Sequence, residues 1–159
     1  MRSFEVEKFS QMLSLLKDKS PQSIGNLSNS LLIEPNKIIS VVSSMSKLGI
    51  PVQVYGQSIS LKFKSDFLDS RIIEKQLSDM CRQKKVYLRT FELIDSTNDF
   101  LISEKTDTSK IAVVLSEIQT QGRGRRGKFW QSPFGSNIYM SIKWNFDPRE
   151  VSPAGLSLV

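Results

Sequence analysis

Apolar positions repeat at helical spacing three times near the start of the chain. The first repeat predicts a helix over residues 4–16. Ser20 as N-cap with Pro21 at the first helical position predicts a short second helix that ends in a turn at residues 28–30. Pro35 opens a third helix that ends near Gly49. The apolar positions of these helices are Phe9, Met12, Leu13, Leu16, Ile24, Leu27, Ile38, Val41, Val42, Met45 and Leu48.

Strict alternation of apolar and polar residues follows the third helix. Two alternating runs flank Gly56 and Gln57 and predict a β-hairpin, with apolar positions Val52, Val54, Ile59, Leu61 and Phe63. Three helices and a hairpin within residues 1–65 are the order of a winged helix-turn-helix domain, whose third helix enters a DNA major groove. A small helical domain with an incidental hairpin is the alternative.

The third helix supplies the candidate DNA contacts. They are its polar residues Asn36, Lys37, Ser40, Ser43, Ser44 and Lys47. Two of these are cations, and Glu34 stands at the end that should approach phosphates. Because few cations make few phosphate contacts, we expect any DNA binding to be weak.

Helices and strands alternate in the second part of the chain, residues 66–159. A fourth helix carries Ile72, Ile73, Leu77 and Met80, followed by a strand at 86–93, a helix at 97–104 and a buried strand at 111–115. Ile138, Met140, Ile142 and Trp144 alternate with polar neighbours and predict a strand with one buried face. The domain boundary is placed near residue 65.

An apolar segment at residues 154–159 closes the sequence. Such a segment usually continues into a helix, so we expect the chain to be the front part of a larger protein with an incomplete second domain. That expectation predicts a disordered Arg-rich loop and exposed apolar surface around Ile142, Trp144 and residues 156–159.

Composition narrows the functional classes. The chain has 159 residues, 39% of them hydrophobic and 24% charged, with a formal net charge of +6, which fits a globular protein. The sequence has no apolar run long enough for a membrane helix and no secretory signal, so we expect a cytosolic protein. One cysteine, Cys81, and no histidine exclude an internal disulfide, a Cys/His zinc site and a Ser-His catalytic couple.

Positive charge is concentrated in the Arg loop, residues 122–128, which contains Arg123, Arg125, Arg126 and Lys128 and no acid. Guanidinium groups on a glycine-rich backbone can close over phosphate or carboxylate. A dinucleotide fingerprint is disfavoured because the residues after the glycines make a poor helix start, and a Walker loop is disfavoured because Phe129 follows Lys128. A solvated surface loop or an RNA-binding Arg/Gly patch remains open.

Two further features point to a ligand site. Ser96 lies between a predicted strand and a predicted helix, where its hydroxyl and nearby N–H groups can bind a ureido or carboxamide group, although capping alone explains it. Trp130 and Phe134 can form the apolar wall of a pocket beside the Arg loop, with ordinary core packing as the alternative.

At these residues the sequence resembles the biotin protein ligase family, in particular its bifunctional members that also act as the biotin operon repressor. The resemblance rests on residues 94–98 (Ile-Asp-Ser-Thr-Asn), residues 119–127, Trp130 with Ser132 to Gly135, residues 137–139 and residues 155–159. It implies an α+β protein with a winged helix-turn-helix domain at 1–65 and the first part of the catalytic domain, a mixed sheet flanked by helices, at 66–159.

The resemblance also implies a reaction and its site. Biotin and Mg·ATP would give biotinyl-5′-adenylate and pyrophosphate, and biotin would then pass to a lysine of a biotin carboxyl carrier protein. The implied biotin and adenylate contacts are Ser96, Thr97, Asn98, Gln119, Gly122, Arg123, Gly124, Arg125, Arg126, Lys128 and Trp130. Arg125 is the implied catalytic residue, which would hold the adenylate, and no resident metal is expected.

Family segments beyond this sequence, among them a Lys-Trp-Pro-Asn-Asp motif, lead us to expect that the chain by itself is inactive. Biotin operator DNA and a second copy in the full-length protein are further implied partners. Two alternatives remain: a DNA-binding regulator that only senses biotin or its adenylate, and a related acyl or lipoate transferase.

Overall fold

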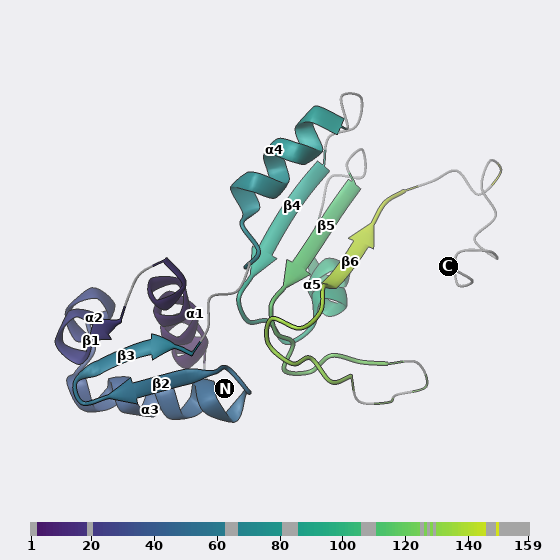
Figure 1. Cartoon of the computed structure of the whole chain (residues 1–159). Helices are drawn as coiled ribbons and strands as arrows, with labels where there is room; N and C mark the ends of the chain where they lie inside the picture. The colour runs from purple at the N-terminus through teal and green to yellow at the C-terminus, as the bar shows by residue number, and fades with distance from the viewer. Residues whose placement is uncertain are drawn as a thin grey trace.

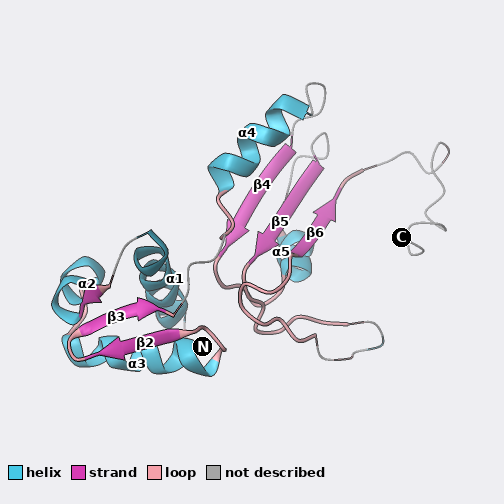
Figure 2. Cartoon of the chain, in the orientation of Figure 1, coloured by secondary structure: helices cyan, strands magenta, loops and turns pink. Residues whose placement is uncertain are grey.

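The chain forms two groups of elements in a computed structural model that describes residues 3–18, 21–62, 67–80, 86–105, 111–124, 126, 128, 130–145 and 149. Figure 1 shows a helical group with a small sheet at the N-terminal end and a second sheet beyond it. Helices and strands are both well represented (Figure 2), so the α+β class with a mixed sheet is confirmed.

The N-terminal group has three helices and three short strands. The helices are α1 (Ser3–Asp18), α2 (Ile24–Leu31) and α3 (Pro35–Lys47). The strands are β1 (Gln22–Ser23), β2 (Val52–Tyr55) and β3 (Ser58–Leu61), paired antiparallel in the order β1-β3-β2. The hairpin is therefore confirmed, and Gly56 at its turn has a φ of 57°, which favours glycine. Strand β1 is absent from the predicted elements, because two residues are too few to show an alternating pattern.

Two local predictions about α2 are wrong. The N-cap is Ser23, whose Oγ accepts a hydrogen bond from the N–H of Asn26 at 3.0 Å, and Pro21 precedes β1 instead of opening the helix. Residues 28–30 lie inside α2 and not in a turn. The C-cap of the helix is Leu32, in the left-handed region with a φ of 54°, and the Ser28 hydroxyl donates to the Ile33 carbonyl at 2.6 Å. A side-chain bond to the backbone thus supports the helix end that the sequence placed too early.

The second group is a mixed three-stranded sheet with two helices. Strands β4 (Val86–Phe91) and β5 (Ile111–Ser116) pair in parallel, and β6 (Tyr139–Lys143) pairs antiparallel with β5. Helix α4 (Ser70–Met80) packs on β4, while α5 (Thr97–Ser103) packs on β5 and β6. These elements match the predicted alternation, and the parallel pair needs the crossover through α5.

Strand β6 confirms one prediction and corrects another. The strand is present, but Ile138, Met140, Ile142 and Trp144 are exposed, with 75, 52, 45 and 41% of their surfaces accessible. Tyr139, on the opposite face, is buried. The prediction that this apolar set forms a buried face is therefore wrong. The expected exposure at Ile142 and Trp144 is confirmed, whereas residues 156–159 lie outside the described residues.

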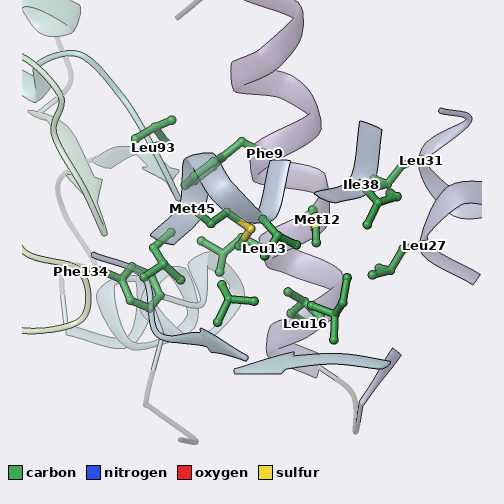
Figure 3. Packing of buried hydrophobic residues seen from close by; sticks show 14 of the residues in the cluster. Phe9, Met12, Leu13, Leu16, Leu27, Leu31, Ile38, Met45, Leu93 and Phe134 are labelled. Carbon is green, nitrogen blue, oxygen red and sulfur yellow. The ribbon is translucent and has the colours of Figure 1, made fainter. Parts of the chain in front are cut away.

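The main hydrophobic core joins the two groups. Phe9, Met12 and Leu13 of α1 pack in one cluster with Leu93 and Phe134 of the second group (Figure 3). Ile118 belongs to the same cluster, and the Phe134 ring lies 5.5 Å from the ring of Phe67, centroid to centroid. The loops that follow β4 and β5 are therefore held against the N-terminal helices by buried apolar side chains. The predicted boundary near residue 65 falls outside the described residues.

Candidate functional site

A pocket of about 210 Å³ opens where the chain leaves β4 and β5 and enters β6. Its lining combines hydroxyls, amides, one guanidinium, and aromatic and aliphatic side chains. The lining residues are Ser96, Thr97, Asn98, Gln119, Arg123, Trp130, Ile138, Tyr139, Met140 and Ser141. Such a mixture of a few polar groups on an apolar wall is typical of small-molecule sites.

Gln119 and Thr97 form the polar base of the pocket. The Gln119 Oε1 atom accepts hydrogen bonds from the Thr97 backbone N–H at 2.9 Å and from the Thr97 hydroxyl at 3.1 Å. The Thr97 hydroxyl also lies 2.8 Å from the Ser141 hydroxyl. Since Thr97 is buried, with 3% of its surface exposed, these bonds fix its orientation. The start of α5 is thereby tied to the segment after β5 and to the middle of β6.

The backbone places Gln119 beside Thr97. Ile94 and Gln119 form a parallel bridge that extends the pairing of β4 with β5 beyond the two strands. The Thr120 N–H donates to the Ile94 carbonyl at 2.9 Å, and the Gln121 N–H donates to the Asp95 carbonyl at 2.8 Å. Ser96 then caps α5, accepting from the Asp99 N–H at 3.3 Å, so the predicted N-cap is confirmed. Its capping role accounts for the buried hydroxyl without a ligand.

Two backbone bonds fold the Arg loop back beside the pocket. The Gly124 N–H donates to the Lys128 carbonyl at 2.7 Å, and the Trp130 N–H donates to the Gly122 carbonyl at 3.1 Å. A Cβ atom added at Gly122 would lie 3.3 Å from both the Gln119 amide nitrogen and the Trp130 side chain. The close packing at Gly122 therefore needs glycine, or a shift of the Gln119 amide that lines the pocket.

Arg123 is the charged member of the described lining residues, and it makes an ion pair with Asp99 in the first turn of α5. The two side chains are 63% and 46% exposed. Arg126 and Lys128 are also exposed but do not line the pocket. Arg126 has a φ of 59°. Arg125, the implied catalytic residue, lies outside the described residues, as do Gly127 and Phe129, so the expected disorder of the loop stays a prediction.

The structure gathers a subset of the candidate residues into one pocket: Ser96, Thr97, Asn98, Gln119, Arg123 and Trp130. Gly122 and Gly124 shape the loop backbone, and Trp130 forms part of the predicted apolar wall. Phe134 does not line the pocket, because it is buried in the main core, so its predicted place in the wall is wrong. The predicted site residues do not include Ile138, Tyr139, Met140 and Ser141, which also line the pocket. The alternation along β6 is the available signal, but alternation alone predicts a core-facing strand.

A second, open cavity of about 460 Å³ lies between α4 and the loop at 135–138, and Glu117 and Asp69 are among its lining residues. Glu117 is buried, accepts from the Leu68 N–H at 2.7 Å, and lies 3.4 Å from the Lys17 ammonium of α1. A hydrogen bond from Arg71 lowers the pKa of the Asp69 carboxyl below its usual 3.8. Both carboxylates therefore already have partners within the chain.

The candidate DNA-contacting residues are brought together on α3. Asn36, Lys37, Ser40, Ser43 and Lys47 are exposed, whereas Ser44 is half-buried and its hydroxyl donates to the Ser40 carbonyl at 3.1 Å. Their exposure leaves this polar surface accessible, and it carries two ammonium groups. The structure therefore brings these residues together on α3, and their contact with DNA stays a prediction.

Within the described residues, no cluster of three or more His, Cys, Asp or Glu side chains is arranged to bind a metal ion. Over the same part of the chain, no helix has the length and apolar character needed to cross a membrane.

Comparison with known proteins gives matches over most of the chain. Residues 90–159 match the Biotin/lipoate A/B protein ligase family. The matched range contains every lining residue of the pocket. The chain is 32% identical over 149 residues to the bifunctional ligase/repressor BirA of Salmonella typhimurium. It is 29% identical over 150 residues to the protein of the same name from Escherichia coli.

These alignments cover 93 and 94% of this chain, but the chain spans only 45% of the length of either curated relative. The resemblance to the biotin protein ligase family that the sequence motifs indicated is confirmed.

Proposed function

We propose that this chain carries the biotin-binding part of a biotin protein ligase, and the match of residues 90–159 to the Biotin/lipoate A/B protein ligase family supports the proposal. The observation that carries the proposal is the bonded group of Gln119, Thr97 and Ser141 at the base of a pocket whose rim holds Arg123. Amide and hydroxyl groups suit a ureido ring, and a guanidinium suits a carboxylate or a phosphate.

The arrangement also fits the shape of an amphipathic anion. Trp130 offers an aromatic surface that is half exposed, and Met140 lines the same pocket, so an apolar ring or alkyl chain would be sheltered on one side. Ser96, Thr97, Asn98 and Gln119 are the proposed contacts for the polar ring. Gly122, Arg123, Gly124, Arg125, Arg126 and Lys128 are the proposed contacts for the charged end and the adenylate.

The proposed reaction has two transfers. An oxygen of the biotin carboxylate attacks the α-phosphorus of ATP, the bond from that phosphorus to the bridging oxygen breaks, and pyrophosphate leaves. A lysine amine of a biotin carboxyl carrier protein then attacks the carbonyl carbon of the adenylate, forming an amide and releasing AMP and a proton. Arginine donors near the phosphate would stabilise the negative charge that develops in both steps.

Magnesium enters this scheme as part of the substrate, bound to the phosphates of ATP. The described pocket lining contains amides, hydroxyls and a guanidinium but no carboxylate, so it does not fit a resident magnesium ion. We therefore assign the chain's own residues to binding and orientation and route no step through a protein-bound metal.

The enzymatic proposal is tested by biotin-dependent exchange between ATP and labelled pyrophosphate, in a form extended to the length of the curated relatives. Exchange that needs biotin supports a ligase, and exchange that needs lipoate instead indicates the lipoate branch of the family. Biotin binding without exchange would contradict the ligase and support a regulator that only senses its ligand. An extended form with Arg125→Gly should release adenylate that the parent retains.

A second function is favoured by the arrangement of the N-terminal group and by the name of the two relatives, which includes the word repressor. We propose that residues 1–65 form a winged helix-turn-helix domain in which α3 approaches DNA through Asn36, Lys37, Ser40, Ser44 and Lys47. A salt-dependent mobility shift with biotin operator DNA tests this role. Replacing Lys37 and Lys47 with glutamine should reduce both affinity and its salt dependence, and unchanged binding would contradict the assignment.

A further inference from the structure

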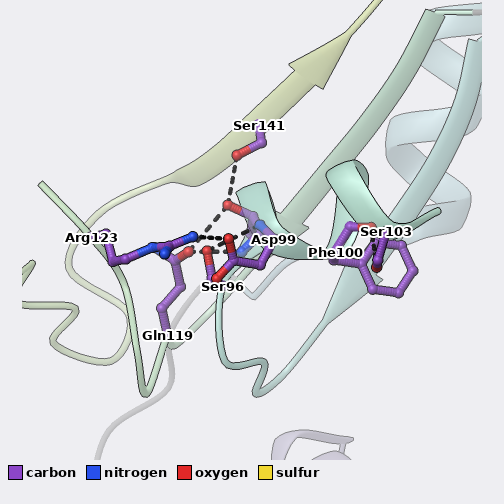
Figure 4. Close-up of polar contacts among 8 residues, drawn as sticks. Ser96, Asp99, Phe100, Ser103, Gln119, Arg123 and Ser141 are labelled. Atoms are coloured by element: carbon purple, nitrogen blue, oxygen red, sulfur yellow. Dashed lines mark hydrogen bonds and ion pairs between the residues drawn. The ribbon is translucent and has the colours of Figure 1, made fainter. Parts of the chain in front are cut away.

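The ion pair at the pocket rim contains a residue that neither the sequence motifs nor the pocket lining identifies. Asp99 does not line the pocket, yet its carboxylate pairs with Arg123, which does. The ion pair therefore occupies an N–H donor of Arg123, which is the one charged side chain among the described lining residues. Figure 4 shows the Arg123 side chain pointing toward Asp99.

Both partners are held by backbone structure, so their approach is built into the fold. The Asp99 N–H donates to Ser96 Oγ at 3.3 Å, and the Phe100 N–H donates to the Ser96 carbonyl at 3.1 Å, which fixes the first turn of α5. On the other side, the bonds at Gly122 and Gly124 hold the backbone on both sides of Arg123. The carboxylate thus stands where it can meet the guanidinium without rearrangement of either segment.

We propose that Asp99 is a resident counter-anion for Arg123: it holds the guanidinium until an anionic group of the ligand replaces the carboxylate. Asp99 is then a specificity-determining positioning residue that weakens binding of anionic ligands relative to neutral ones. The identity of the anionic ligand rests on the proposed function, but the competition for Arg123 does not.

The exposure of the pair makes this exchange feasible. A partly exposed ion pair typically contributes no more than about 1 kcal/mol, because water and salt screen it and both side chains lose freedom. A ligand carboxylate or phosphate can therefore displace Asp99. Removing the Asp99 charge should strengthen binding of an anion by about two- to fivefold, the range such a pair allows.

The first test compares the affinity of the chain for biotin with its affinity for the neutral carboxamide of biotin, both measured by calorimetric titration. Asp99→Asn should tighten biotin about two- to fivefold and leave the carboxamide unchanged, while Asp99→Glu should restore the wild-type ratio. Glu74→Gln, at an exposed position on α4, removes the same charge outside the pocket and serves as the matched control. Weaker biotin binding, or equal changes for the two ligands, would overturn the proposal.

A second measurement needs no binding of biotin. The chain has two tryptophans, so Trp144→Phe leaves Trp130, which lines the pocket together with Arg123, as the fluorescent reporter. In that background Asp99→Asn should raise quenching by iodide about twofold at low salt, without raising quenching by neutral acrylamide. The increase should be absent in Glu74→Gln and in the double variant Asp99→Asn, Arg123→Gln.

The two measurements separate the possible failures. If the wild-type chain does not bind biotin, the proposed function is contradicted, while iodide quenching still decides whether Asp99 neutralises Arg123. If biotin binds but the ratio of its affinity to that of the carboxamide is the same in Asp99→Asn, the inference about Asp99 is wrong and the proposed function stands. An unchanged ratio of iodide to acrylamide quenching likewise overturns it.

Discussion

The ion pair of Lys17 with Glu117, at the junction of the two groups of elements, and the ion pair of Arg123 with Asp99, at the rim of the pocket, differ mainly in burial. At the junction, the side chains of Lys17 and Glu117 are only 10% and 6% exposed. At the rim, those of Arg123 and Asp99 are 63% and 46% exposed. Because the first pair is buried, breaking it would leave an unpaired buried charge and destabilise the fold. The second pair is exposed and weak, so a ligand can replace one of its partners.

The surroundings reinforce this difference. Glu117 also accepts the Leu68 N–H, and the Lys17 ammonium lies 4.6 Å from the centre of the Phe67 ring. The next residue along the chain, Ile118, is buried in the shared core, and Gln119 after it forms the pocket base. The junction therefore anchors the segment after β5 that carries the pocket base, whereas the proposed exchange with a ligand concerns the exposed rim pair.

The largest effect should come from the apolar part of the junction. Phe134→Ala removes a buried ring from the shared core and should lower the free energy of unfolding by about 3–5 kcal/mol, measured by urea denaturation. Ile142→Ala, at an exposed position, is the control and should change stability by less than about 0.5 kcal/mol. Equal effects from the two substitutions would show that the core does not cross between the groups.

The buried ion pair should rank next. Glu117→Gln leaves the Lys17 ammonium with Glu92, at 3.9 Å, as its remaining acidic partner and should cost about 2 kcal/mol. A double-mutant cycle with Lys17→Met measures the coupling between the two side chains by urea denaturation. A coupling near zero would mean that the junction depends on apolar contacts alone.

The polar base of the pocket should affect binding more than stability. Gln119→Leu removes the acceptor of two hydrogen bonds from Thr97 and should destabilise the chain by about 1–2 kcal/mol. Biotin binding should weaken by at least about tenfold, because the same amide is a proposed ligand contact. Calorimetry at a temperature where both proteins remain folded separates the two effects, and unchanged affinity would remove Gln119 from the site.

The rim pair should have the smallest effect on stability. Asp99→Asn should change the free energy of unfolding by less than about 1 kcal/mol, since both charges are partly solvated. Thermal denaturation of Asp99→Asn beside Glu117→Gln tests the contrast between the two pairs directly. A loss at Asp99 as large as that at Glu117 would contradict the view that the rim pair is exchangeable.

Local periodicity and capping chemistry were enough to predict most elements of this fold. The stripe at Ile38, Val42 and Met45 is buried as α3 requires, and Ser96 caps α5 as its position indicates. The prediction that Pro21 opens α2 is wrong, because a proline before a strand and a proline at a helix start look alike in sequence. The prediction that the apolar face of β6 is buried is also wrong, because alternation shows that the two faces of a strand differ but not which face is covered.

The site was predictable where short motifs carry their own geometry. Ser96, Thr97 and Gln119 follow strand ends, and the parallel pairing of β4 with β5 brings those ends together. The pair between Asp99 and Arg123 was not predictable, because it depends on how an Arg-loop side chain meets a helix 24 positions earlier in the chain. Phe134 was misplaced for a similar reason: the sequence does not reveal that the core extends to the N-terminal helices.

The central claim is that the pocket built on Gln119 and Thr97 binds biotin, and calorimetric titration of biotin into the chain and into Gln119→Leu tests it most directly. The account predicts saturable binding to the wild-type chain and affinity at least about tenfold weaker in Gln119→Leu. An absence of binding by the wild-type chain, or equal affinities for the two proteins, would contradict the claim.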